Sequence, residues 1–232
     1  LSQIAPVVAY PKNAWQTLWR EQITMDATAM GKQAEGEKLV KDLDALIKEI
    51  KEKCSNYIIK TIFIGGGTPS YLETKELEKL LKVIKNLNLS KDIEYSMECN
   101  PGTLTKEKLM VMKKSGVNRI SFGLQSANDQ ELRSIGRIHN FAKFKESYEL
   151  ARKVGFENIN VDLMYGLPNL TVDLWKETLE KVCDLRPEHI SAYSLIIEEG
   201  TAFYSLYNKN KLNLPSEDDE RIMDKLTKDI LK

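Results

Sequence analysis

Short apolar segments alternate with amphipathic stretches from Glu37 onward, and this alternation constrains the fold more than any other feature of the chain. Strand-like runs separated by helical patterns are typical of βα units, whose strands pair in parallel. The sequence therefore predicts an α/β fold built on a parallel sheet. The predicted strands are Tyr57–Ile64, Ile93–Glu98, Arg119–Gly123, Asn158–Leu163 and His189–Ile197.

The segments between these runs carry the spacing and the end signals of helices. Apolar side chains recur at helical spacing in 39–50 and 77–84, and further helices are predicted over Phe141–Val154 and Val172–Cys183. The hydroxyl groups of Thr74 and Ser216 are each placed to cap a helix, and Thr105 is predicted to open another one.

The N-terminal region differs from the rest. Ile4–Tyr10 is apolar and could form a sixth strand, although Pro6 interrupts it. Asn13–Gly36 follows no clear period, so no structure is predicted for it.

The composition excludes several classes of protein. The 34 basic and 34 acidic side chains cancel, so we expect no general attraction to nucleic acid or anionic lipid. No apolar run reaches the roughly 18 residues that span a bilayer, and no secretion signal opens the chain, so we expect a cytoplasmic protein. Cys54, Cys99 and Cys183 are odd in number and far apart, which favours free thiols over disulfides or a local zinc site.

Polar residues follow the predicted strands at the edge where parallel βα folds bind ligands. Gly65–Gly67 and Thr68 follow the first of these strands, and Glu98 ends the next. Three glycines would let a ligand approach the backbone closely, but they could also simply form a tight turn. Glu98 could bind ribose hydroxyls or an ammonium group, or it could be a solvated strand end.

Three further side chains could take part in a site. A buried carboxylate at Asp162 would need a partner, which Arg119 or Arg137 could supply. Arg137 could bind a ligand carboxylate through two hydrogen bonds, or it could lie free on the surface. His139 could be a ligand or a proton donor, although a lone histidine is more often structural.

Five ordered segments of this chain resemble one family, and five motifs in one order are far more specific than any single short pattern. Over roughly residues 37–205 the chain is similar to the radical S-adenosylmethionine (SAM) enzymes of the oxygen-independent coproporphyrinogen III oxidase group, and within it to the heme chaperones. The segments are GGGTPSYL (65–72), ECNPGTLT (98–105), RISFGLQSANDQELRSIGRIHN (119–140), NVDLMYGLPNLT (160–171) and SAYSLIIEEGT (191–201).

The resemblance implies a partial (β/α)6 barrel of parallel strands that is open enough on one side to admit a large tetrapyrrole. It also implies SAM bound across the strand ends. By position, Gly66, Gly67 and Thr68 would line the methionyl and sulfonium end of SAM, and Glu98 would hold its amino acid or ribose part.

Four more positions are carried over from the same resemblance. Gln125, Arg137 and Asp162 match residues that contact a second SAM in the oxidase branch, and Ser194 matches a position after the last strand. The implied domains are an atypical segment at 1–36, the radical SAM core at 37–205 and a helical segment at 206–232, with the rest of the family's C-terminal region absent.

One motif of the family has no counterpart in this chain. The family holds a [4Fe-4S] cluster on a CxxxCxxC loop after its first strand, whereas Ala9–Thr17 contains no cysteine and the three thiols of the chain do not match the loop. Natural loss of the site, a sequence altered upstream of about Glu37, and ligands from another chain are the explanations left open. The resemblance therefore leaves open whether the chain is an enzyme.

Three functions follow from the resemblance. The first is that of a heme chaperone, which binds heme and SAM, delivers heme to an acceptor protein and would need an electron donor for any radical step. The second is oxidative decarboxylation of coproporphyrinogen III in porphyrin biosynthesis. The third is a binding domain without the cluster, favoured by the absence of the loop cysteines.

Overall fold

The computed structural model describes residues 19–54 and 56–232, and the chain divides into two compact units, Leu1–Ile58 and Ile59–Lys232. The first unit contains α1 (Trp19–Ala29) and α2 (Gln33–Cys54), which pack on each other. All of α1 and the first turn of α2 fall where the sequence predicted no structure. The possible strand Ile4–Tyr10 lies outside the described residues.

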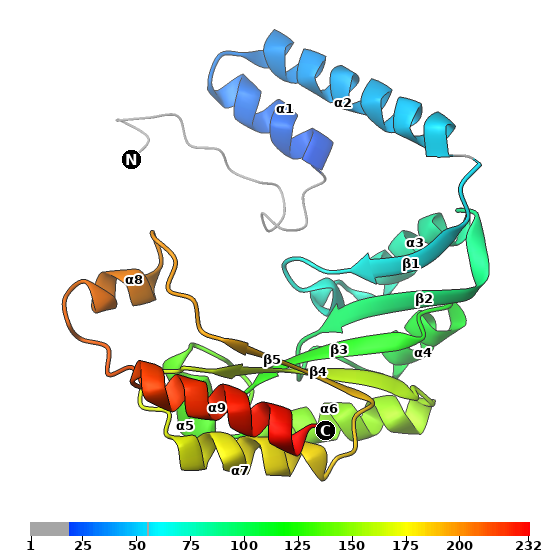
Figure 1. Ribbon diagram of the computed structural model, residues 1–232. Coiled ribbons are helices and arrows are strands. Elements are labelled where there is room, and N and C mark those ends of the chain that lie inside the picture. Colours follow the sequence, from blue (N-terminus) through cyan, green and yellow to red (C-terminus); the bar gives the residue numbers. More distant parts are fainter. Residues whose placement is uncertain (1–18, 55) are drawn as a thin grey trace. The chain divides into compact units, whose positions relative to one another are not determined.

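The second unit is built on five parallel strands in the order β1-β2-β3-β4-β5 (Figure 1). Each crossover moves the chain by one strand in the same direction, as in a half-barrel, so the predicted parallel α/β fold is confirmed. The sixth strand of the implied barrel has no counterpart within the described residues. The strands are β1 (Ile59–Ile64), β2 (Leu89–Cys99), β3 (Arg119–Gln125), β4 (Asn158–Tyr165) and β5 (His189–Ser194).

Helices follow each of the first four strands and cover one face of the sheet (Figure 1). The observed ranges of α6 and α7 match the predicted ones, and α9 packs against α7. The longer helices are α3 (Thr74–Lys85), α4 (Lys106–Lys114), α6 (Phe141–Val154), α7 (Val172–Cys183) and α9 (Glu217–Ile230). The short ones are η2 (Pro69–Tyr71), α5 (Asp129–Ser134) and α8 (Ala202–Tyr207).

The helix starts predicted at Thr105 and Ser216 are confirmed. The Thr105 hydroxyl accepts a hydrogen bond from the backbone of α4, and Ser216 forms a capping box with Asp219 at the start of α9. The prediction for Thr74 was wrong, because the chain enters α3 one residue earlier. Glu73 is the N-cap residue, with extended backbone angles and no side-chain cap, and Thr74 is already helical.

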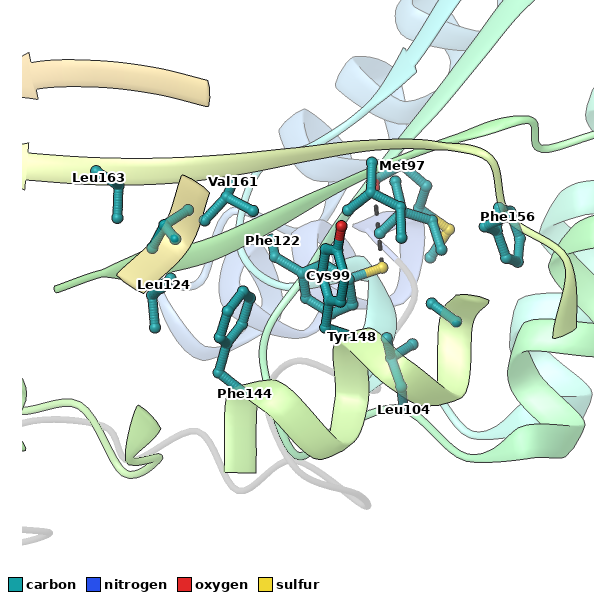
Figure 2. Close-up of a cluster of buried hydrophobic side chains, with 14 of the residues drawn as sticks. Met97, Cys99, Leu104, Phe122, Leu124, Phe144, Tyr148, Phe156, Val161 and Leu163 are labelled. Atoms are coloured by element: carbon teal, nitrogen blue, oxygen red, sulfur yellow. Dashed lines mark hydrogen bonds between the residues drawn. The ribbon is translucent and has the colours of Figure 1, made fainter. Parts of the chain in front are cut away.

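The core lies between the sheet and its helices. Every second side chain of β3, starting from Ile120, is fully buried, and the Phe122 ring meets the Phe144 ring of α6 edge-on with 5.7 Å between their centroids. Figure 2 shows Phe122, Phe144, Tyr148 and Cys99 in this cluster. Since neighbouring residues of a strand point to opposite faces, the remaining side chains form the other face of the sheet.

The boundary between the two compact units follows residue 58. This division does not test domain boundaries that come from family resemblance, so the ranges 1–36, 37–205 and 206–232 stay a prediction. Within the described ranges, no helix is both long enough and apolar enough to cross a membrane.

Candidate functional site

The face of the sheet that turns away from the core is polar. Its side chains alternate with the apolar side chains of the core, and hydrogen bonds link them from strand to strand. Several of them are themselves buried, namely Ser96, Ser121, Gln125 and Asn160. We call this set the polar face: Ser96, Glu98, Arg119, Ser121, Gln125, Asn160, Asp162, His189, Ser191 and Tyr193, together with Gly123.

Glu98 holds the glycine loop that follows β1. The backbone amide of Gly66 donates a hydrogen bond of 3.0 Å to Glu98 Oε2. A Cβ at Gly65 would lie 2.6 Å from the Phe63 ring and 2.9 Å from the Glu98 carboxyl carbon, so a larger residue there would displace one or both side chains. Gly66 and Gly67 have positive φ angles, and a Cβ on either would meet nothing within 4 Å. The loop is thus both a tight turn and open to an approaching ligand.

Asn100 connects Thr68 with Arg137. The Asn100 amide nitrogen donates to Thr68 Oγ1 at 3.0 Å, and its oxygen lies 3.5 Å from an Arg137 guanidinium nitrogen, at the limit of a hydrogen bond. A Cβ at Gly123 would stand 3.2 Å from the same oxygen, so the bare backbone of β3 leaves room for this link. Arg137 is therefore half-buried at the strand ends and not free on the surface.

Gln125 ends β3 with an unusual backbone. Its φ angle is 76°, and the register between β3 and β4 shifts between Gly123 and Gln125. Left-handed backbone at a residue other than glycine is strained, and such strain gathers at functional sites. The irregularity leaves Gln125 on the polar face, where its side-chain oxygen accepts a 2.6 Å hydrogen bond from the Tyr193 hydroxyl.

Tyr193 lies in the electrostatic field of four predicted site residues. Partial burial raises the pKa of its hydroxyl, and the carboxylates of Asp162 and Glu98 raise it further. The hydrogen bond to Gln125 and the charge of Arg137 act in the opposite direction. These side chains come from β2, β3, β4 and the loop after α5, so the fold brings Glu98, Gln125, Arg137 and Asp162 together.

Neutral groups, and not an arginine, hold Asp162. Its two carboxylate oxygens accept hydrogen bonds from Ser121 Oγ at 3.0 Å and from the Asn160 amide at 2.7 Å. The prediction that Arg119 or Arg137 pairs with it was wrong. Asp162 is only half-buried on an open sheet face, so two neutral donors and solvent suffice for its charge.

Two candidates lie apart from this cluster. The Ser194 hydroxyl donates to Glu220 of α9 at 2.8 Å, which places it on the helix-covered side of the sheet. His139 is 7% exposed, and its Nε2 lies 3.4 Å from the Leu124 carbonyl oxygen. Burial, assisted by the charge of Arg137, lowers the pKa of His139. These surroundings are those of a structural histidine and not of a ligand or proton donor.

Sequence reasoning missed Asn100, Ser121, Asn160 and Tyr193 as parts of the network. The alternation of polar residues along β3, β4 and β5, broken only by Gly123, could have found the last three of these residues. Asn100 follows β2, so the signal for it is its position after a strand end.

The described residues differ in how well they fit the two cofactors that the resemblance implies. Carboxylates, an arginine, an amide and open glycine backbone suit the charged amino acid and the ribose of SAM. For the cluster the fit fails, because Cys99 is buried in the core, where burial raises its pKa, and Cys183 ends α7. No group of three or more His, Cys, Asp or Glu within 19–54 and 56–232 could hold a metal ion.

A parallel half-barrel with a glycine loop after β1 and the polar face described above defines a cofactor-binding α/β domain. The chain belongs to the Radical SAM superfamily, whose family model matches residues 22–182. The resemblance seen in the sequence is therefore confirmed, and this family uses SAM and a [4Fe-4S] cluster.

Individual proteins similar to this chain identify the branch of the superfamily that it resembles. The heme chaperone HemW of Bacillus subtilis is 46% identical over 167 residues, which cover 71% of this chain and 44% of that protein. The HemW of Lactococcus lactis is 42% identical over 193 residues, or 82% and 51% of the two chains. Among solved structures, the coproporphyrinogen III oxidase HemN of Escherichia coli matches with a TM-score of 0.68 and 28% identity, covering 84% of this chain and 45% of that one. The chain thus spans about half the length of these relatives.

Proposed function

We propose that this chain binds heme and passes it to an acceptor protein, and that it binds SAM along the carboxyl ends of its strands. The names of its relatives support the heme part. The observation that carries the SAM part is the position of Tyr193 in the common field of Glu98, Arg137 and Asp162, because it places oppositely charged groups around one point of the open face. A zwitterionic ligand needs both signs of charge.

Glu98 and the glycine loop form one half of the proposed SAM site. The Glu98 carboxylate already accepts the Gly66 amide and would hold the ammonium group or the ribose hydroxyls of SAM. Gly66, Gly67 and Thr68 would line the methionyl end, where the backbone of the two glycines is open.

Gln125, Arg137 and Asp162 form the other half. Arg137 would pair with a carboxylate, while Gln125 and Asp162 would bind polar groups of a second SAM or of a substrate. Ser194 would act from behind the sheet, by holding the end of β5 to Glu220 of α9.

When its cluster is present, the family's SAM chemistry supplies a carbon-centred radical. The residues of this chain would bind and orient the ligand. Ala9–Thr17 lacks cysteine, which favours heme and SAM binding without radical chemistry over oxidative decarboxylation. The similarity to HemN keeps decarboxylation of coproporphyrinogen III as the second candidate. Of these two candidate functions, only decarboxylation needs an electron donor.

Three measurements on the purified chain test the proposal. Absorbance titration with heme should give a saturable Soret band, and calorimetry should give a saturable SAM isotherm. Iron and acid-labile sulfide after anaerobic reconstitution show whether a cluster forms. Absence of heme binding would exclude the chaperone role, whereas a stoichiometric cluster with SAM cleavage would favour the oxidase reaction.

A further inference from the structure

His189 opens β5 on the polar face, and its side chain is exposed. It is one of only two histidines in the sequence, and the other, His139, is buried with Nε2 directed at a backbone carbonyl. Imidazole is among the commonest ligands of heme iron. His189 is therefore the one imidazole of this chain that solvent, and a ligand arriving from solvent, can reach.

A hydrogen-bond network determines which ring nitrogen of His189 carries the proton. One end of the Asn160 side chain faces Asp162 at 2.7 Å and Ser121 at 2.7 Å. Because a carboxylate only accepts hydrogen bonds, that end must be the amide nitrogen. The opposite end is then the oxygen, which accepts from Ser191 Oγ at 3.1 Å and from Nδ1 of His189.

The proton of a neutral His189 thus lies on Nδ1, and the lone pair lies on Nε2. Among the described residues, none forms a hydrogen bond with Nε2. Donation from Nδ1 to a protein oxygen is the arrangement that orients metal-bound histidines and strengthens them as ligands. Asn160 is 2% exposed, so the group that orients the ring is itself held firmly.

The backbone at His189 is also anchored. The carboxylate of the preceding residue, Glu188, accepts a hydrogen bond of 2.9 Å from the Ile159 amide of β4. Arg152 of α6 forms a 2.9 Å ion pair with the same carboxylate. The ring is thus presented from a rigid strand end, as a preorganised ligand requires.

We propose that Nε2 of His189 is the axial ligand that this chain supplies to heme iron. The inference rests on the proposed heme function and assigns it a site. Heme iron already carries four porphyrin nitrogens, so one oriented imidazole is enough to complete a site where the described residues offer no multidentate metal cluster. The exposed side chain of His189 leaves the ring within reach of a ligand from solvent.

The test is a titration of the full chain with ferric heme, followed by absorbance, in the wild type, His189→Ala and His139→Gln. His189→Ala should shift the Soret band and weaken binding by at least about tenfold, and added imidazole should restore the wild-type spectrum. His139→Gln, the matched control, should keep the spectrum and affinity of the wild type.

A second measurement needs no substitution. Pulsed electron paramagnetic resonance of the wild-type complex, prepared with ¹⁵N-labelled histidine, should show coupling between the iron and an imidazole nitrogen. An unchanged spectrum and affinity in His189→Ala, or no such coupling, would overturn the assignment while leaving the heme function intact. Failure of the wild type to bind heme would overturn both.

Discussion

The hydroxyl of Tyr193 donates a 2.6 Å hydrogen bond to the side-chain oxygen of Gln125, across β5 and β3. The bond leaves the Gln125 amide nitrogen directed toward Gly123, where an added Cβ would lie 3.3 Å from it. The Asn100 oxygen would lie 3.2 Å from the same Cβ position, so a donor and an acceptor converge over bare backbone. Tyr193 thereby sets which groups the centre of the polar face offers to a ligand.

Tyr193→Phe should weaken SAM binding without unfolding the domain. The ring is kept, but Gln125 loses the donor that orients its amide, and a neutral hydrogen bond is worth about 0.5–1.5 kcal/mol, or about two- to tenfold in affinity. Calorimetry with SAM measures the change. Tyr207→Phe, at an exposed tyrosine of α8, is the matched control and should bind as the wild type does. Equal affinity in both variants would remove Tyr193 from the site.

Glu98→Gln should weaken SAM binding more strongly. The amide keeps the shape of the side chain, but charge-assisted hydrogen bonds are lost, and these contribute about 1.5–3 kcal/mol each. We expect a loss of affinity of at least about tenfold by calorimetry. Glu73→Gln, at an exposed carboxylate before α3, should have no effect. If Glu98→Gln binds SAM normally, the carboxylate serves only to hold Gly66.

Asp162→Ala should also lower SAM affinity while the fold stays intact. The substitution leaves the donors on Ser121 and Asn160 without their acceptor, but water can reach this half-exposed position. We therefore expect a loss of stability of only about 1 kcal/mol in urea denaturation. Asp173→Ala, at an exposed position of α7, controls for loss of a negative charge. Wild-type SAM affinity in Asp162→Ala would remove Asp162 from the binding site.

The Glu131 carboxyl should make folding stability depend on pH. Burial raises its pKa, its Oε2 accepts a 2.5 Å hydrogen bond from Ser126, and its Oε1 is buried without a protein partner. A raised pKa means that the folded state favours the protonated acid. Its contribution to stability is therefore complete below the unfolded pKa, near 4.3, and is lost as pH rises through the raised folded value.

Glu131→Gln removes this titration and keeps the hydrogen-bonding shape. The variant should be more stable than the wild type at pH 7, and the difference should shrink toward pH 4. Urea denaturation at both pH values measures it. A wild-type advantage at pH 7 would show that the charged form is favoured in the folded state, contrary to the expectation.

The sequence predicted the sheet well because alternation between apolar runs and amphipathic helices is a local signal that each βα unit repeats. The helix starts at Thr105 and Ser216 were predicted correctly for the same reason, since they depend on a few neighbouring residues. Helix α1 was missed, because its weakly periodic side chains show little of the amphipathic pattern on which the prediction relied.

The candidate site was only partly predictable. Strand-end positions identified Glu98, Gln125 and Asp162, and the family resemblance added Arg137 from the loop after α5. The fold does bring these four together, because parallel strands end at one edge and this loop returns to it. The partners of these residues could not be predicted, since the bond from Tyr193 to Gln125 joins residues 68 positions apart and depends on sheet register. Asp162 illustrates the same limit, because its partners Ser121 and Asn160 became visible only once β3 and β4 were paired.

The left-handed backbone of Gln125 has a consequence for engineering this domain. A residue held in such a conformation costs of order 1–3 kcal/mol, which glycine at the same position would largely recover. Laboratory evolution toward a higher melting temperature would therefore favour replacing the side chain that Tyr193 orients. Thermostable variants selected without a binding screen would tend to lose the amide at the centre of the polar face.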